Sequence, residues 1–174
     1  VQWLVSQLRV EDLSASVSQS VKERGGRIAL VASFLLVLLI KRKKIKTNLH
    51  ANQQYVGHVG MDRTAFTLLA LVNSTLLALP GVLAFSLAAL LLMEGNAFFA
   101  ALSKGFTAAA FIMFLLALIR NVATKDGLGE KHFHWNPGSL RAIRRELLLL
   151  MACVIPVTVV MTAISASPDG AEYD

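Results

Sequence analysis

Long apolar runs separated by hydrophilic segments dominate this chain. Residues 65–93 carry no charge, and residues 97–119 follow after a short polar turn, so the two runs predict long helices joined as an antiparallel hairpin. Residues 147–164 are just long enough to span a bilayer, whereas residues 28–40 reach only about 20 Å as a helix. The pattern predicts an all-α membrane protein with about four transmembrane helices in antiparallel hairpins, at residues 25–44, 65–93, 97–119 and 147–164.

The segment before the first run has a different character. Residues 1–24 place apolar side chains at helical spacing among charges that nearly cancel, which is typical of an amphipathic helix outside the membrane. Gly25 and Gly26 predict a break after this helix. Arg24 and Arg27 on one side and the following cations on the other can extend along the apolar zone, which lets the short first run span the bilayer.

Cations are distributed unevenly between the spans. The loop at 41–64 holds six Lys or Arg against one acid, and the loop at 120–146 holds six against three. The turn at 94–96 and the segment after residue 164 hold none. The first cluster consists of Lys41, Arg42, Lys43, Lys44 and Lys46. Because Lys and Arg beside spans stay on the cytoplasmic side, both basic loops predict four spans with the two chain ends on the opposite side.

This topology sets the domain organisation that we expect. In a bacterial inner (cytoplasmic) membrane both ends of the segment are periplasmic. Residues 1–24 then end a preceding periplasmic helical region, residues 25–165 form the four-span module, and residues 166–174 form an acidic periplasmic tail.

Composition agrees with a membrane protein. Hydrophobic residues make up 55% and charged residues 16% of the chain, and the mean hydropathy is +0.60. A net charge of +6 is compatible with nucleic-acid binding. The cations lie in two loops rather than on one basic face, so no nucleic-acid partner is expected.

Catalytic and metal-binding patterns are weak. No carboxylate lies within a span, and Cys153 is the one cysteine, so neither a proton relay nor a disulfide framework is expected. His132 and His134 without a third nearby ligand favour a solvated role over a metal site. The interpretation is a protein that is not an enzyme and needs no cofactor. A small-solute transporter would need inverted repeats and midplane polar groups, and no repeat is visible.

Pro80 and Gly81 lie at the centre of the second run. Proline removes the hydrogen bond to the carbonyl of Leu76, and Ser74 and Thr75 are close enough to help satisfy that turn. The pair marks either a permanent packing kink or a gating hinge.

The third run has a face of small residues and one cation. Ala101, Gly105 and Ala109 lie four apart, which lets a neighbouring helix approach closely. Lys104 is the ionisable residue within a span. It either extends outward or pairs with Glu94, and a functional cation site is the alternative.

An arginine face precedes the last span, in a short helix that Asn136 or Ser139 can cap. It consists of Arg141, Arg144 and Arg145, which are spaced to share one side of the helix. Trp135 beside it is a typical interfacial anchor. The face either obeys the positive-inside rule alone or also contacts anionic lipid headgroups.

The segment GLGEKHFHWNPGSLRAIRREL at residues 127–147 resembles the cytoplasmic loop in the inner-membrane helical region of large MscS-like mechanosensitive channels, of the MscK (KefA) and MscM type. It shares the HF-x-W core, then LR-x-x-RR-x-L, then an apolar span with a proline. The start of the first span, Arg24-Gly25-Gly26-Arg27, is similar as well. The resemblance covers residues 21–165.

The resemblance implies a peripheral module of membrane helices around a pore that this chain does not contain. Such channels are homo-heptamers that open under membrane tension and release ions and osmolytes during hypo-osmotic shock. The chain would be the lipid-facing, tension-sensing part, with membrane lipids and the rest of the channel as partners. The alternative is a standalone four-helix scaffold or subunit that binds another membrane protein.

Overall fold

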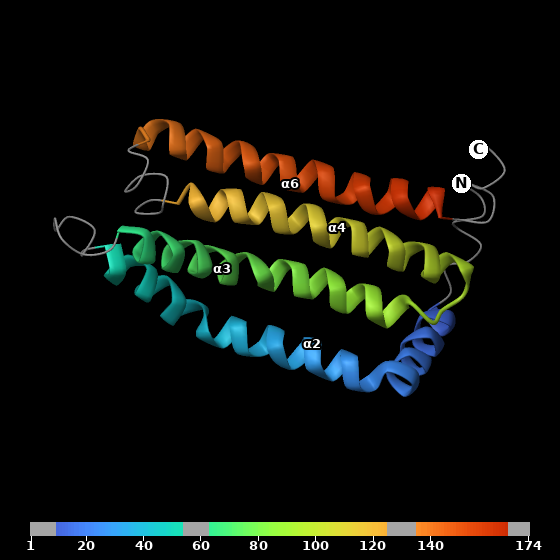
Figure 1. Ribbon diagram of the computed structural model, residues 1–174. Coiled ribbons are helices and arrows are strands. Elements are labelled where there is room, and N and C mark those ends of the chain that lie inside the picture. Colours follow the sequence, from blue (N-terminus) through green and yellow to red (C-terminus); the bar gives the residue numbers. More distant parts are fainter. Residues whose placement is uncertain (1–9, 54–62, 125–134, 167–174) are drawn as a thin grey trace.

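The structure is a computed structural model that describes residues 10–53, 63–124 and 135–166. These residues form helices and no strand: α2 Val10–Gln53, α3 Arg63–Leu92, α4 Ala97–Val122 and α6 Pro137–Ser165. Figure 1 shows the helices side by side in one antiparallel row, in the order α2, α3, α4, α6. The extensive contacts join each helix to the next one in the sequence. The all-α architecture of antiparallel hairpins that the sequence predicts is confirmed.

Three of the helices are long and apolar enough to cross a bilayer: Leu71–Leu92 of α3, Ala97–Val122 and Pro137–Ser165. The second half of α2 lies beside α3 in the same row, but its shorter apolar run does not place it among these three. The sequence predicts a fourth span there, at residues 25–44.

Apolar side chains are buried in the seams between neighbouring helices. One cluster joins Ala78 of α3, Ala117 of α4 and Met151 of α6. Within the apolar windows, 28% of the residues are buried in α4, 17% in α3 and 11% in α6, the outermost of the three. A row that is one helix thick therefore leaves much of its apolar surface uncovered.

Two side-chain hydrogen bonds join α3 to α4. The Ser103 hydroxyl donates to the carbonyl of Ala89 at 2.8 Å, and the Asn121 amide donates to the carbonyl of Ser74 at 3.1 Å. Such bonds between membrane helices contribute about 0.6 kcal/mol each on average. They fix the hairpin at two levels, one near each end.

A kink divides α2 into two parts. Arg24 has φ −126° and ψ 18°, which is not helical, one residue before the predicted break at Gly25 and Gly26. A Cβ on either glycine would meet nothing within 4 Å, so the glycines do not make room for a neighbour. They weaken the helix instead, since glycine is about 1 kcal/mol less favourable than alanine in a helix. We call residues 10–23 the arm, and Figure 1 shows it leaving the row at an angle.

The second part of α2 continues past its apolar run. The sequence predicts a span that ends near residue 44 and a basic loop from residue 41, but the helix extends to Gln53. Lysine and arginine are good helix formers, so the basic cluster ends the apolar zone without ending the helix.

The other helix ends follow local capping chemistry. A short turn separates Leu92 from Ala97, as predicted, and the Asn96 side chain accepts a hydrogen bond from the backbone N–H of Phe99 at 3.1 Å. Asn136 caps α6 by accepting from the N–H of Gly138 at 2.8 Å. The sequence predicts a separate short helix before the last span. This prediction is wrong, because α6 is a single helix over Pro137–Ser165.

Candidate functional site

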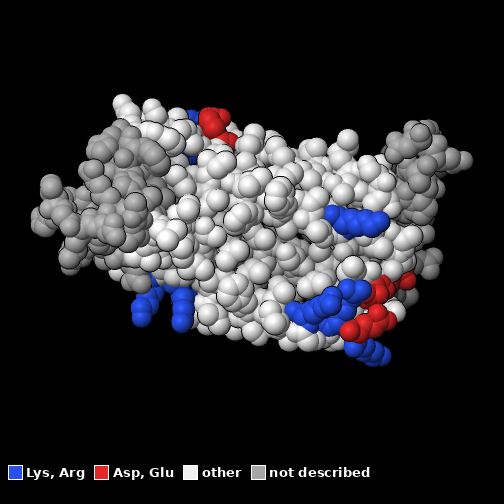
Figure 2. All heavy atoms as spheres, viewed as in Figure 1, with Lys and Arg blue, Asp and Glu red and all other residues white. Residues whose placement is uncertain are grey.

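The row exposes large apolar side chains along its outer helices. Leu30 of α2 is 69% exposed and Met161 of α6 is 62% exposed. Figure 2 shows charged side chains gathered near the two ends of the row, with a broad and nearly uncharged surface between them. Soluble monomers rarely expose contiguous apolar patches larger than a few hundred Å². A continuous band of this kind fits contact with lipid or with other membrane helices.

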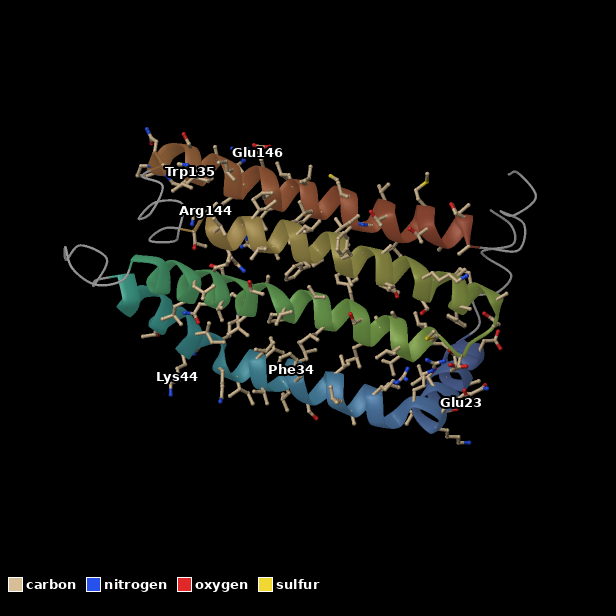
Figure 3. The ribbon with its side chains drawn as sticks, in the orientation of Figure 1. Glu23, Phe34, Lys44, Trp135, Arg144 and Glu146 are labelled. Carbon is tan, nitrogen blue, oxygen red and sulfur yellow. The ribbon has the colours of Figure 1, made fainter. Side chains whose placement is uncertain are left out.

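One end of the row collects cations from the two outermost helices. In Figure 3, Lys44 of α2 lies at the same end of the row as Trp135 and Arg144, which lie at the beginning of α6. The exposed cations at this end are Lys41, Arg42, Lys43, Lys44, Arg141 and Arg145, while Arg144 is half-buried. Lys46 lies in α2, but its side chain is outside those described. The structure thus places the basic segments of α2 and α6 at the same end of the row, as the charge pattern predicts for one side of the membrane.

At the opposite end, the arm and the kink residue Arg24 contact the α3–α4 turn. The Arg24 Nε donates to the Glu94 Oε1 at 2.6 Å, and the two side chains are 30% and 21% exposed. Ser16 and Ser20 of the arm are 2% and 0% exposed. The Ser16 hydroxyl would lie 2.5 Å from a Cβ at Gly95, so the arm rests directly on the glycine of the turn. These contacts fasten the arm across the end of the hairpin.

The pairing of Arg24 with Glu94 was not predicted from the sequence, which offers Lys104 as a partner of Glu94. Seventy residues separate Arg24 from Glu94, and no periodic pattern links them. The available signal was local: a cation beside a glycine pair and an acid in a tight turn, both at ends of apolar runs. Joining them requires knowing that α2 and α3 are neighbours.

Lys104 is exposed on α4 and lies inside the apolar zone of that helix. Glu94 pairs with Arg24 instead. An extended lysine that reaches the headgroup region and a functional cation site each require the ammonium of Lys104 on the surface, where it lies.

Gly81, next to Pro80 in α3, lies against α4. A Cβ on Gly81 would be 2.6 Å from the terminal methyl of Met113. The Thr75 hydroxyl donates to the carbonyl of Leu71 at 3.0 Å, so it does not serve the carbonyl of Leu76 as the sequence suggests. The helix continues through the proline, and its neighbour at this point is the flexible thioether of a methionine.

The small-residue face of α4 is buried, and its central glycine lies against α6. Ala101, Gly105 and Ala109 are all buried. A Cβ on Gly105 would lie 2.5 Å from the carbonyl oxygen of Val159, so the two backbones touch at this glycine. Helices of membrane proteins pack in this way through small residues.

No metal site is present within residues 10–53, 63–124 and 135–166: no three His, Cys, Asp or Glu side chains lie close enough to hold an ion. Cys153 is free and exposed on α6. His132 and His134 lie outside the described residues.

An antiparallel row of helices, apolar across its middle and cationic at one end, defines a multi-span α-helical membrane protein. A family model described as mechanosensitive ion channel inner membrane domain 1 matches residues 27–174. The chain belongs to this family, which is one of ion-channel domains and not of enzymes. The resemblance to the inner-membrane region of MscS-like channels is therefore confirmed. No curated protein and no solved structure matches the chain.

Proposed function

We propose that this chain is the peripheral, lipid-facing and tension-sensing part of a large bacterial mechanosensitive channel, of the MscK or MscM type. The single observation that carries the proposal is the one-helix-thick row, whose apolar side chains are exposed on its outer helices. Family membership favours a channel module over the alternative, a standalone membrane scaffold. The pore lies outside this chain. If the resemblance extends to assembly, the channel contains seven copies of the chain in total.

In this proposal α2 is the fourth span. Its apolar run is short, but Arg27 at one end and Lys41 to Lys44 at the other are exposed and long enough to reach both headgroup layers. The end that carries the basic clusters of α2 and α6 is then cytoplasmic, and the arm and the α3–α4 turn are periplasmic. The arginine face of α6 lies among anionic headgroups, where each cation contributes about 1 kcal/mol.

Tension acts on such a row through its area in the plane of the membrane. A state that occupies more area becomes more populated under tension, provided that the two states differ in area. A row of helices with lipid along its length transmits the lateral force of membrane tension to the rest of the channel. Weakening its contact with lipid should therefore raise the tension needed for opening.

Replacing the exposed Met161 by asparagine is expected to raise the opening pressure of the full-length channel. The polar amide lowers the affinity of α6 for acyl chains, so less force reaches the pore. Pressure thresholds measured in membrane patches, against a second channel in the same patch as reference, provide the test. Ser165→Asn, an already polar and exposed position at the end of α6, is the matched control. Equal thresholds for both variants and the native channel would contradict a lipid-facing role.

We propose that Pro80 and Gly81 form a hinge, because the methionine packed against Gly81 can adjust without a backbone shift. Pro80→Ala restores the missing hydrogen bond and stiffens α3. The expected result is a changed opening pressure with unchanged conductance in single-channel recordings. A variant that opens at the native pressure would make the proline a fixed packing kink.

A further inference from the structure

A cavity opens at the kink of α2, outside the basic end already described. Glu23, Arg24, Gly26 and Arg27 line it, and its volume is about 460 Å³. All four residues belong to one stretch of α2, so the cavity is open to its surroundings and not enclosed. A Cβ on Gly26 would meet nothing within 4 Å, so the backbone itself is accessible from the cavity.

The residues around the cavity carry both signs of charge. Arg24 donates to Glu94 through its Nε, which holds the guanidinium in place and leaves its Nη groups as donors. The Glu23 Oε1 accepts from the side-chain amide of Gln19 at 3.2 Å, which holds the carboxylate. Glu94 already balances the charge of Arg24, so Arg27 and Glu23 supply the remaining charges, which suit a ligand with a phosphate and an ammonium close together.

An apolar lane continues from this charged cavity. Leu30 and Phe34 follow Arg27 by three and seven positions, which places all three on one side of α2. Leu30 is 69% and Phe34 43% exposed. In Figure 3, Glu23 lies at the kinked end of α2 and Phe34 lies along the helix toward Lys44. A molecule that fits both the charged cavity and the apolar lane therefore has an apolar tail next to a charged head.

We propose that this cavity binds the headgroup of a zwitterionic phospholipid that carries a primary ammonium. The phosphate accepts hydrogen bonds from Arg27 and Arg24, the ammonium donates to Glu23, and one acyl chain lies along Leu30 and Phe34. The placement in the outer leaflet rests on the proposed function. A free phosphate would satisfy the arginines, but it would bring neither an ammonium to Glu23 nor an acyl chain to Leu30 and Phe34.

Photochemical capture at residue 30 tests the site. The full-length channel carrying a benzoylphenylalanine in place of Leu30 is reconstituted in phosphatidylcholine vesicles, alone or mixed with phosphatidylethanolamine or phosphatidylglycerol. After illumination, mass spectrometry identifies the lipid adduct and its yield. Phosphatidylethanolamine should give the highest yield. Arg27→Gln should lower that yield about tenfold through the loss of a charge-assisted contact. Lys22→Gln, an exposed neighbour that does not line the cavity, should leave the yield unchanged.

Glu23→Gln should lower the yield with phosphatidylethanolamine but not with phosphatidylglycerol, which has no ammonium. Equal yields for Arg27→Gln and Lys22→Gln would overturn the proposal, as would complete loss of the adduct in excess inorganic phosphate, which would show a free-anion site. The same photoreactive group at Met161 separates this outcome from failure of the proposed function. Adducts at residue 161 without any at residue 30 remove only the headgroup site, while the absence of adducts at both positions removes the lipid-facing role.

Discussion

Replacing Gly105 by alanine is expected to lower the free energy of unfolding by about 1–3 kcal/mol, although alanine is the stronger helix former. The added Cβ would lie 2.5 Å from the carbonyl oxygen of Val159, so α4 and α6 must move apart along their seam. Backbone atoms give way less easily than a side chain. Unfolding of the purified full chain in mixed micelles, driven by a denaturing detergent, measures the effect.

Two other glycines are matched controls for this substitution. Gly25→Ala adds a Cβ that meets nothing within 4 Å, so it should stabilise α2 by up to about 1 kcal/mol. Gly81→Ala meets the terminal methyl of Met113, which can rotate away, so its effect should be small. If Gly105→Ala were as stable as Gly25→Ala, the close contact between α4 and α6 would be wrong.

Removing either partner of the Arg24–Glu94 pair is expected to detach the arm from the α3–α4 turn. The single variants Arg24→Gln and Glu94→Gln should each cost about 1–2 kcal/mol, more than the ~0.2–1 of exposed pairs and less than the ~3–5 for breaking a buried one. The intermediate value follows from the partial exposure of both side chains, 30% and 21%. Exchanging the two residues, in Arg24→Glu with Glu94→Arg, should recover part of the loss.

The reactivity of a cysteine at Ser16 reports the position of the arm. In a Cys153→Ser background, Ser16→Cys should react slowly with a water-soluble maleimide when Arg24 and Glu94 are intact and faster in the single-charge variants, because residue 16 is 2% exposed when the arm is docked. Glu23→Gln is the control, since its carboxylate bonds within its own helix. Equal labelling rates in all variants would show that the ion pair does not hold the arm.

The helices themselves were largely predictable from local pattern. Uncharged runs at residues 65–93 and 97–119 predict α3 and α4 because a membrane helix must satisfy its own backbone and present apolar side chains along its whole length. Helix ends were less predictable where polarity and propensity disagree. The basic cluster after residue 40 ends the apolar zone, yet α2 continues to Gln53 because lysine and arginine favour helix.

Contacts between helices were only partly predictable. The four-residue spacing of Ala101, Gly105 and Ala109 marks a seam on α4, but nothing in that spacing names α6 as the partner. The Arg24–Glu94 pair depends on two neighbouring elements whose lateral order no local pattern encodes. Such features become visible only when the arrangement of the row is known.

The interfaces between neighbouring helices also determine how the effects of several substitutions on stability combine. Because each helix packs mainly on its sequence neighbours, the α2–α3, α3–α4 and α4–α6 interfaces behave as nearest-neighbour couplings in one dimension, as in a repeat protein. Perturbations in different seams should then add, whereas those within one seam should interact. α3 and α4 each have two extensive interfaces, whereas α2 and α6 have one each, so the module has a centre held from both sides and two edges held mainly from one side.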